Sequence, residues 1–430
     1  MKKILFLTYD GLTDPLGQSQ VLPYISHLSA QGFKFYVLSF EKPERFAKEE
    51  ATISRLCAQA GIVWIPLSFH SNPPVAAKIY DRMMMKKNAI RLHRKHGFDM
   101  VHCRSYPSAE VGLHLKKKFG LPFLFDMRGF WADEKLDSGH WNQNKPWFRW
   151  MYRYYKNLER DFLNEADQVI SLTFAGKKEL IRKYSIQYRA FSMLHQVQPW
   201  LEEKISVIPT CADLSHFDYH HIRQDQQQAL RKQLGIREGQ HVLSYSGSLG
   251  TWYMMDEMLQ FFKTYRNKFP DAVFLCLTKE PKSMMRAYVQ RNGIDPASVI
   301  TSFSNREQLP LHLSLSTCSV FFIRPTYSKM SSSPTKYAEL MGLGIPVVCN
   351  DIGDTGKIAE ASRSGVLVNA FDEASYQKAL DRMDNLASPE QIRSAAFDYF
   401  DLDMAVVNYR KVYDRILGSP TYSDTRSVYS

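Results

Sequence analysis

Short apolar runs rich in β-forming residues alternate with helical patterns along this chain, and the alternation occurs twice. Such alternation is typical of a parallel sheet covered by helices. The first set of runs comprises residues 4–9, 35–40, 62–67, 100–103, 123–127, 169–173 and 205–209. The second set comprises residues 242–247, 272–277, 319–323, 345–349 and 365–368. The pattern therefore predicts an α/β protein with two doubly wound, Rossmann-like domains in tandem.

The length agrees with two domains, because 430 residues exceed what one hydrophobic core usually organises. The segment QPWLEEK, residues 198–204, interrupts both periodicities. We therefore predict an N-terminal domain over 1–203 and a C-terminal domain over 204–393. A helical pattern over about 394–418 follows the last strand and is expected to pack back on the first domain. The polar residues 419–430 are predicted to form a disordered tail.

Cysteine use and charge limit the compartment and the partners. The six cysteines are scattered without a Cys-x-x-Cys pair, which suggests buried thiols in a reducing compartment. The start, MKKILFLTYDG, fits a first strand, and no run reaches the roughly 18 apolar residues of a membrane span. We predict a cytoplasmic protein whose membrane contact is at most peripheral. The formal charge of +11 calls for a polyanionic partner, and nucleic acid fits poorly because no nucleic-acid-binding signature accompanies the charge.

The segment IRPTYSKMSSSPTKYAELMGLGIPVVCND, residues 323–351, predicts a strand, a serine-rich loop, a helix and another strand. Ser333 is expected to cap the helix and Pro334 to occupy its first position. The free N–H groups and the partial positive charge of a helix start stabilise a diphosphate. Further positive charge would come from Arg324, Lys329 and Lys336. An ordinary capped crossover helix is the alternative explanation.

Glu339 lies about one and a half turns inside this helix, where a carboxylate can accept hydrogen bonds from both hydroxyls of a ribose. A solvated surface glutamate is the alternative. The stretch around it, SSSPTKYAELMGLGIPVV (331–348), resembles the donor-binding segment of family-4 glycosyltransferases, which have the GT-B fold. Other stretches resemble the same family in the same order, namely TYDGLTDPLGQSQVLPYISHLSAQG (8–32), VISLT (169–173), VIPTCADLSHF (207–217) and SYSGSLGTWY (244–253).

The resemblance implies two Rossmann-like domains facing across a cleft. It also implies transfer of a sugar from a nucleotide-sugar with retention of the anomeric configuration. Glu339 is then expected on the ribose, and the helix start on the diphosphate. The donor-binding residues that it marks in the second domain are Gly247, Ser248, Ser331, Ser332, Ser333, Pro334, Thr335 and Glu339.

Two positions depart from the family pattern. The family usually has a second glutamate eight positions before Glu339, in contact with the sugar, and Ser331 stands there. After Gly247 many members carry an Arg and Lys pair that faces the phosphates, whereas this chain has SLGTW at 248–252. If the family chemistry holds, other cations must compensate the charge of the leaving group. The candidates are Arg324, Lys329 and Lys336.

The first domain offers two clusters of candidates. Gly17, with Gln18 beside it, lies in the loop after the first strand and would let the backbone approach the sugar phosphate, although a simple turn also explains this glycine. Asp126 and Arg128 follow a buried strand. They are candidates for contact with the acceptor or the transferred sugar, and a structural ion pair is the alternative. His102 and Arg104, after the preceding strand, are weaker candidates of the same kind.

Two basic segments, residues 78–97 and 144–157, mix lysine and arginine with methionine or aromatic residues. They suit an anionic membrane surface or a lipid-diphosphate acceptor, while a helix with one buried and one solvated face is the alternative. No metal is predicted, because the Asp-Leu-Asp sequence at 401–403 lies far from every donor motif.

We therefore predict transfer of a hexose-type unit from a UDP- or GDP-sugar to a glycan or lipid-linked acceptor, in cell-envelope or exopolysaccharide biosynthesis. The expected catalytic residues are Asp126, Arg128, Arg324 and Lys336. The nucleotide-sugar is a co-substrate, and no other cofactor is expected. Two other functions stay open at this point, a nucleotide-sugar epimerase on the same fold and a non-catalytic basic scaffold that binds membrane or nucleic acid.

Overall fold

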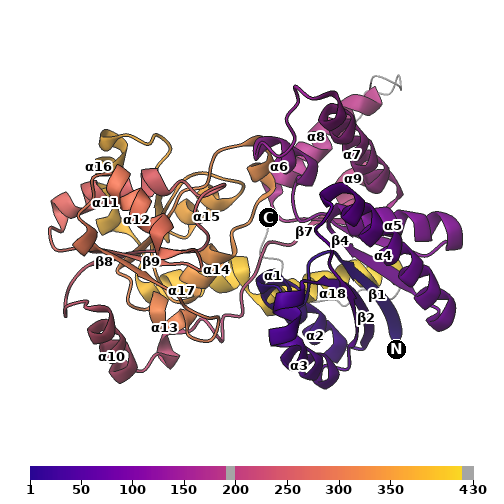
Figure 1. The fold of residues 1–430 in the computed structure, drawn as a ribbon, viewed down its shortest axis with the longest axis horizontal. Coiled ribbons are helices and arrows are strands. Elements are labelled where there is room, and N and C mark those ends of the chain that lie inside the picture. Colours follow the sequence, from indigo (N-terminus) through magenta and orange to yellow (C-terminus); the bar gives the residue numbers. More distant parts are fainter. Residues whose placement is uncertain (190–198, 419–430) are drawn as a thin grey trace. The chain divides into compact units, whose positions relative to one another are not determined.

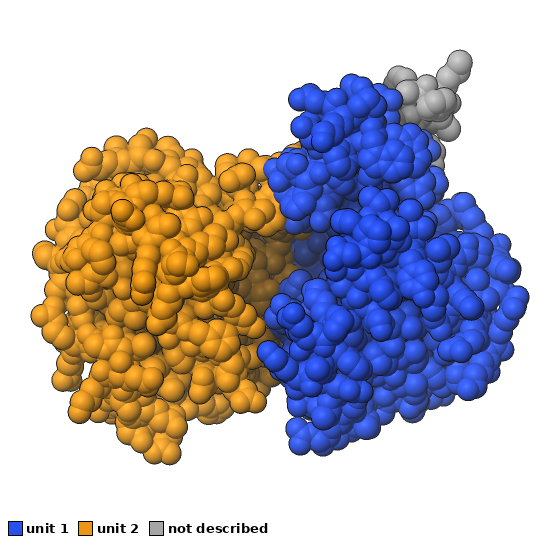
Figure 2. All heavy atoms as spheres, in the orientation of Figure 1, with its two compact units in different colours: residues 1–209, 402–430 blue, residues 210–401 orange. Residues whose placement is uncertain are grey.

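The computed structural model describes residues 1–189 and 199–418. Its contacts divide the chain into two compact units, one of residues 1–209 with those from Leu402 onward and the other of residues 210–401 (Figure 2). The predicted domain boundary lies between residues 203 and 204. In the structure the strand Ile205–Val207 pairs with the sheet of the first unit, so this unit extends past the predicted boundary. The predicted tail, residues 419–430, lies outside the described residues.

The first unit is built on a seven-stranded parallel sheet with the order β3-β2-β1-β4-β5-β6-β7 (Figure 1). Strand β1 (Lys2–Thr8) pairs on both sides, with Ile4 opposite Phe35 and Met100. The other strands are β2 (Phe33–Glu41), β3 (Val63–Ser68), β4 (Met100–Arg104), β5 (Phe123–Asp126), β6 (Gln168–Ser171) and β7 (Ile205–Val207). Each apolar run predicted here forms one strand, which confirms this half of the predicted fold.

The second unit contains a six-stranded parallel sheet with the order β10-β9-β8-β11-β12-β13. Its strands are β8 (Val242–Ser246), β9 (Val273–Leu277), β10 (Val299–Ser302), β11 (Cys318–Phe321), β12 (Val347–Cys349) and β13 (Gly365–Leu367). Five of them match the predicted runs, and β10 was missed. This strand lies at the sheet edge, and all of its residues are half-buried. A strand in that position does not need a continuous apolar run, and β10 has none.

Both sheets reverse the direction in which the chain adds strands, the first between β1 and β4 and the second between β8 and β11. Right-handed crossovers then place the helices of each half on opposite faces of the sheet. In such folds ligands bind beyond the carboxyl ends of the strands, at the point of reversal. A site is therefore expected in the loops that follow these four strands.

The helices of the two units connect these strands (Figure 1). Those of the first unit are α1 (Pro15–Gln20), α2 (Leu22–Ala30), α3 (Pro43–Gln59), α4 (Pro74–His96), α5 (Ser105–Phe119), α6 (Trp131–Asp137), α7 (Pro146–Glu165), α8 (Phe174–Arg189), α9 (Pro199–Lys204) and α18 (Leu402–Leu417). Those of the second are α10 (Gln224–Leu234), α11 (Met255–Lys268), α12 (Lys282–Arg291), α13 (Leu309–Leu313), α14 (Thr335–Gly342), α15 (Thr355–Ala361), α16 (Glu373–Arg382) and α17 (Pro389–Phe400). None of the described helices has the length and apolar composition that a membrane span requires.

The segment predicted as one C-terminal helix, 394–418, is divided in the structure between α17 and α18. Helix α17 begins with a capping box, in which the side chains of Ser388 and Gln391 each accept a hydrogen bond from the other's backbone N–H. Asp401 has an extended backbone conformation and ends this helix. Helix α17 packs on α14 in the second unit, and α18 packs on α2 in the first.

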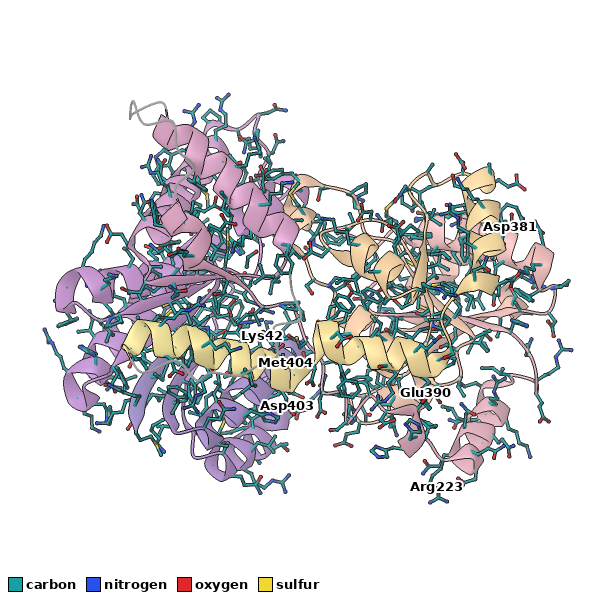
Figure 3. All side chains as sticks on the ribbon, turned by 180° about the vertical axis from the view of Figure 1, so that it is seen from behind. Lys42, Arg223, Asp381, Glu390, Asp403 and Met404 are labelled. Atoms are coloured by element: carbon teal, nitrogen blue, oxygen red, sulfur yellow. The ribbon has the colours of Figure 1, made fainter. Side chains whose placement is uncertain are left out.

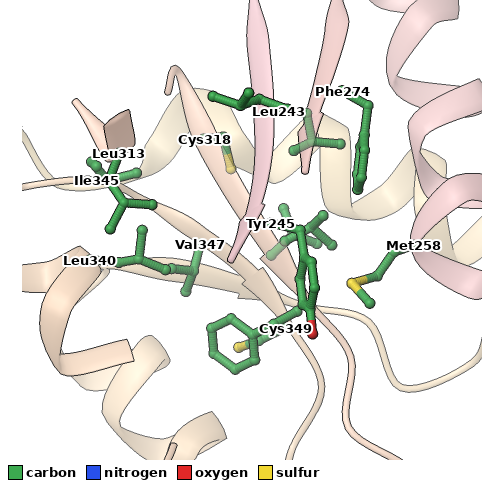
Figure 4. Packing of buried hydrophobic residues seen from close by; sticks show 14 of the residues in the cluster. Leu243, Tyr245, Met258, Phe274, Leu313, Cys318, Leu340, Ile345, Val347 and Cys349 are labelled. Atoms are coloured by element: carbon green, nitrogen blue, oxygen red, sulfur yellow. The ribbon is translucent and has the colours of Figure 1, made fainter. Parts of the chain in front are cut away.

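The core of the second unit surrounds its central strands (Figure 4). Leu243, Tyr245, Phe274 and Val347 are almost fully buried there. Burial of each such side chain contributes roughly 1.5–3 kcal/mol, which holds the carboxyl ends of the strands in place. All six cysteines of the chain are buried, as the sequence predicts.

Candidate functional site

Helix α14 is the predicted phosphate-binding helix, and no side chain caps its start. The helix begins one residue later than predicted, with Pro334 as the N-cap and Thr335 as the first helical residue. The prediction that Ser333 caps it is wrong, because the Ser333 hydroxyl accepts a hydrogen bond from the backbone N–H of Thr210 (3.1 Å). Without a side-chain cap, N–H groups of the first turn remain available to an anion.

Lys336, the second residue of α14, carries a buried ammonium group with no hydrogen-bond partner among the described residues. Its Nζ lies 3.6 Å from the centre of the Tyr253 ring and 4.2 Å from that of Tyr245. The ring faces attract the charge but do not replace hydrogen bonds. Burial lowers the pKa of Lys336 to about 7, although the carboxylate of Glu339 acts in the opposite direction. An anionic ligand would stabilise the charged form.

Gly247 directly follows β8 and leaves room for the ammonium group of Lys336. Its φ of 141° is a conformation that residues with side chains rarely adopt. A Cβ at this position would lie 2.7 Å from Nζ of Lys336 and 3.1 Å from the hydroxyl oxygen of Tyr245. Glycine is therefore required both by the backbone and by the approach of the lysine to the end of the strand.

Glu339 lies one turn after Lys336 on α14 and is buried, so the solvated-surface interpretation of this glutamate is wrong. Burial raises the pKa of Glu339, and the charges of Arg306 and Lys336 oppose that increase. Nη1 of Arg306 lies 3.9 Å from Oε1 of Glu339. The sequence pattern does not indicate Arg306, because this residue follows β10, a strand without a continuous apolar run.

The other predicted residues of the second unit differ in their burial and in their contacts. Ser331, at the position where a glutamate is usual, is buried and its hydroxyl donates to the carbonyl of Ser328 (2.9 Å). Lys329 is buried with Nζ 3.7 Å from the centre of the Trp252 ring. The predicted residues that are half-buried or exposed are Ser248, Arg324, Ser332, Pro334 and Thr335. Lys329 and Lys336 thus both reach the loop after β8, Lys329 at Trp252 and Lys336 at Gly247.

The uncapped helix start, the buried ammonium group and the glycine loop converge where the second sheet reverses its strand order. Two of these features supply positive electrostatic potential, and the third lets a ligand approach the backbone. This arrangement can bind an anionic group such as a phosphate. The buried carboxylate of Glu339 can accept hydrogen bonds from hydroxyl groups of the same ligand.

At the corresponding edge of the first sheet, Asp126 ends β5 beside two arginines and a histidine. Its carboxylate lies 3.8 Å from Nη1 of Arg104, 3.8 Å from Nη1 of Arg128 and 3.5 Å from Nε2 of His102. The Tyr409 hydroxyl donates a hydrogen bond to it (3.2 Å). Burial acts to raise the pKa of Asp126, but the arginine charges and the histidine contact outweigh burial and lower it. The four residues predicted after two neighbouring strands therefore form one cluster.

Helix α18 supplies tyrosine hydroxyls to this cluster, which was not predicted. The hydroxyl of Tyr413 lies 2.7 Å from Nδ1 of His102, beside the contact of Tyr409 with Asp126. Arg128 has a φ of 55°, which is uncommon and costly for a residue other than glycine. A strained backbone held by buried polar contacts is frequent at functional sites. No local signal in the sequence links these tyrosines to Asp126.

A buried carboxylate that the sequence did not single out holds the loop after β1. Glu41, the last residue of β2, accepts hydrogen bonds from the backbone N–H groups of Leu12 (2.9 Å) and Thr13 (3.1 Å). The hydroxyls of Thr13 and Ser39 also donate to it, each at 2.5 Å. Glu41 is only 3% exposed, and these four donors compensate the charge of its carboxylate. They also fix the conformation of the loop.

Gly17 lies inside α1, where the helix packs closely on the preceding loop. A Cβ here would lie 2.1 Å from the carbonyl oxygen of Gly11 and 2.6 Å from Cα of Leu12. Gln18 donates from its side-chain amide to the carbonyl of Thr13 (3.2 Å). Close packing therefore gives a physical reason for this glycine, and contact of Gly17 and Gln18 with a ligand stays a prediction.

We expect Gly17→Ala to lower the free energy of unfolding by about 1–3 kcal/mol, because the added methyl group must displace backbone atoms. Urea unfolding measures the change. Ser19→Ala on the same helix is the control and should change the free energy by less than about 0.5 kcal/mol. A Gly17→Ala protein as stable as this control would contradict the close approach of helix and loop.

No group of three or more His, Cys, Asp or Glu side chains in residues 1–189 and 199–418 is arranged to hold a metal ion. Asp403, the second aspartate of the Asp-Leu-Asp sequence, lies at the start of α18 (Figure 3). Its carboxylate lies 3.0 Å from Nδ1 of His27.

Two protein-family models match the chain, one mostly in the first unit and the other within the second. The model described as Glycosyltransferase Family 4 matches residues 19–216, and the model described as Glycosyl transferases group 1 matches residues 226–397. No curated protein matches the sequence significantly.

Solved structures share the fold over nearly the whole chain. Sucrose-phosphate synthase from Thermosynechococcus elongatus has a TM-score of 0.70 and 15% identity, with 97% of this chain and 100% of that chain covered. HepE from Anabaena, solved in complex with UDP and glucose, has a TM-score of 0.67 and 14% identity, with 96% and 100% covered. A putative UDP-N-acetylglucosamine 2-epimerase from Listeria monocytogenes has a TM-score of 0.57 and 12% identity, with 98% of each chain covered.

The fold is thus shared by transferases and by an epimerase, so the fold alone does not separate the two activities. The family models separate the two activities, because both models describe glycosyltransferases and each matches most of one unit. The protein is a glycosyltransferase with the two Rossmann-like units of the GT-B fold, and it belongs to the family-4-type glycosyltransferases.

Proposed function

We propose that this glycosyltransferase transfers a hexose-type unit from a UDP- or GDP-sugar to a glycan or lipid-linked acceptor, with retention of the anomeric configuration. It acts in the cytoplasm, in cell-envelope or exopolysaccharide biosynthesis, and it requires neither a metal ion nor another bound cofactor. The observation that carries the proposal is the buried ammonium group of Lys336, which has no hydrogen-bond partner among the described residues at the uncapped start of α14.

In this proposal the diphosphate of the donor lies at the start of α14, in contact with Lys336 and the loop at Gly247. The ribose hydroxyls donate to Glu339. When the bond between the sugar and the diphosphate breaks, the nucleoside diphosphate leaves with the bonding electrons. The ammonium group and the helix N–H groups stabilise the negative charge that develops on it. HepE, a solved structure of the same fold, holds UDP and glucose, which supports a donor of this class.

The acceptor hydroxyl forms the new bond on the face of the sugar that the leaving group vacates, and its proton passes to a phosphate oxygen of the departing nucleoside diphosphate. We place Asp126 and Arg128 in contact with the acceptor or the transferred sugar. The lowered pKa of Asp126 keeps its carboxylate ionised and able to accept hydrogen bonds from sugar hydroxyls.

Thermal unfolding with and without UDP or GDP tests the donor assignment. A nucleotide at about 100 times its dissociation constant should stabilise the fold by about 2.7 kcal/mol. Release of nucleoside diphosphate from the donor should then require an acceptor, which an epimerase would not need. Absence of protection by both nucleotides would contradict the proposed donor class.

Donor affinity should rise as the pH falls through about 7, because the pKa of Lys336 in the free protein is about 7 and the charged form binds the diphosphate. Above this pKa the affinity should fall by up to about tenfold per pH unit. Isothermal titration calorimetry with UDP-glucose and GDP-mannose measures this affinity as a function of pH. The diphosphate of a nucleotide-sugar does not change its charge near pH 7, so the ligand does not contribute to the dependence. Lys336→Met should abolish the dependence, and a variant with the pH profile of the wild type would exclude Lys336 as its source.

A further inference from the structure

The two basic segments that the sequence singled out form α4 and the first half of α7, and both helices expose apolar side chains. Trp147 and Trp150 of α7 are 54% and 55% exposed. Ile79 and Met83 of α4, one turn apart, are also exposed. A group of large exposed apolar side chains on one surface marks an interaction site far more often than a single one does.

Helices α4 and α7 are neighbours in the first unit, because both are tied to Glu110 of α5. Arg82 of α4 donates from Nη1 to Glu110 (2.8 Å) and to the hydroxyl of Tyr155 on α7 (3.0 Å). The hydroxyl of Tyr154 on α7 donates to the same glutamate (3.5 Å). Helix α5 packs against both α4 and α7 (Figure 1). We call the surface of Ile79, Met83, Trp147, Arg149, Trp150 and Arg153 the α4–α7 face.

The aromatic rings of this face are stacked on one another. The ring centres of Trp147 and Trp150 are 5.1 Å apart with an interplanar angle of 22°, and those of Trp150 and Tyr154 are 5.6 Å apart at 13°. A sugar binds an aromatic side chain by packing on a free ring face, and here the faces between neighbouring rings are occupied. Exposed indole edges with polar N–H groups are suited instead to the boundary between lipid headgroups and acyl chains.

The charges of the face favour an anionic surface. Arg149 and Arg153 are exposed, and neither has a carboxylate within ion-pair distance among the described residues. On the same helix, by contrast, Lys156 pairs with Asp133 (2.8 Å) and Glu159 (2.5 Å). Lipid phosphates would supply the missing negative charge.

We propose that the α4–α7 face docks the first unit on an anionic phospholipid surface. The tryptophans insert at the headgroup level, and the arginines contact lipid phosphates. This inference goes beyond the proposed function, because it assigns a partner to a surface that the donor site does not use, and it stands without the donor assignment.

Flotation of the full-length protein with phospholipid vesicles tests the proposal. One set of vesicles consists of phosphatidylcholine alone, and the other of phosphatidylcholine and phosphatidylglycerol in equal parts. The wild type should float with the second set only, and less so as salt is added. Arg149→Gln with Arg153→Gln should lower the partition coefficient by about 25-fold, at about fivefold per charge. Trp147→Ser with Trp150→Ser should lower it by at least about tenfold.

Phe397→Ser in the second unit is the matched control, because Phe397 is an exposed aromatic residue 5.3 Å from the guanidinium of Arg393. It should float like the wild type. Equal flotation of the wild type and the double variants would overturn the proposal. So would a tryptophan variant that loses only glycan binding or only self-association. UDP or GDP protection, measured on every variant, reports the donor site separately and should not change.

Discussion

Lys336→Met is expected to lower turnover by about 10²–10³-fold, because it removes the fixed positive charge beside the departing diphosphate. The same change should leave the free protein folded and at least as stable as the wild type. A buried ammonium group without hydrogen bonds destabilises the native state, and methionine fills a similar volume without that charge. Steady-state kinetics and thermal unfolding measure the two effects.

The combination of lost activity and retained stability separates a functional role of Lys336 from a structural one. Lys378→Met, at an exposed position of α16, is the matched control and should change neither quantity. If Lys336→Met unfolded at a lower temperature than the wild type and kept its turnover, the ammonium group would have a structural role between Tyr245 and Tyr253.

Asp126→Asn is expected to lower the free energy of unfolding by about 3–5 kcal/mol, because it leaves the buried Arg104 and the largely enclosed Arg128 without their common carboxylate. The folded-state pKa of Asp126 is lowered, so its contribution to stability is present above the unfolded pKa of about 4 and is lost as the pH falls through the folded pKa. The difference in the free energy of unfolding between variant and wild type should therefore have its full size at neutral pH and decrease at acidic pH.

Urea unfolding of Asp126→Asn as a function of pH checks both the size and the sign of this effect. Asp271→Asn is the control, because Asp271 is 52% exposed and its pair with Arg237 (3.3 Å) is open to solvent. Such a pair contributes about 0–1 kcal/mol. A deficit in Asp126→Asn no larger than that of the control would mean that the two arginines are compensated by other groups.

The architecture was predictable because its main signal is local. An apolar run that forms a central parallel strand is buried on both faces, and this makes β1, β4, β8 and β9 visible in the sequence. Edge strand β10 lacks that signal, because its residues are only half-buried. The start of α17 could have been recognised, since Ser388 and Gln391 have the spacing of a capping box before a helix.

The candidate site was predictable only where one segment contains it. Lys336 and Glu339 share one helix, so a single stretch of sequence pointed to both. Their surroundings depend on contacts between distant segments. Arg306 follows an unrecognised strand, and Glu41 looks like an ordinary charged residue until its backbone partners are known.

The cap of α14 shows the same limit. Ser333 has the residue type and the position of an N-cap, and its hydroxyl is instead bonded to the backbone of Thr210, more than a hundred residues earlier. A tertiary contact thus overrides the local preference and leaves the helix start without a side-chain cap.

A crystal structure of the protein with bound UDP or GDP would show where the nucleotide binds. We expect the diphosphate at the start of α14, with a phosphate oxygen within hydrogen-bond distance of Nζ of Lys336 and the ribose hydroxyls on Glu339. A nucleotide bound elsewhere, with the ammonium group still enclosed between Tyr245 and Tyr253, would contradict this expectation.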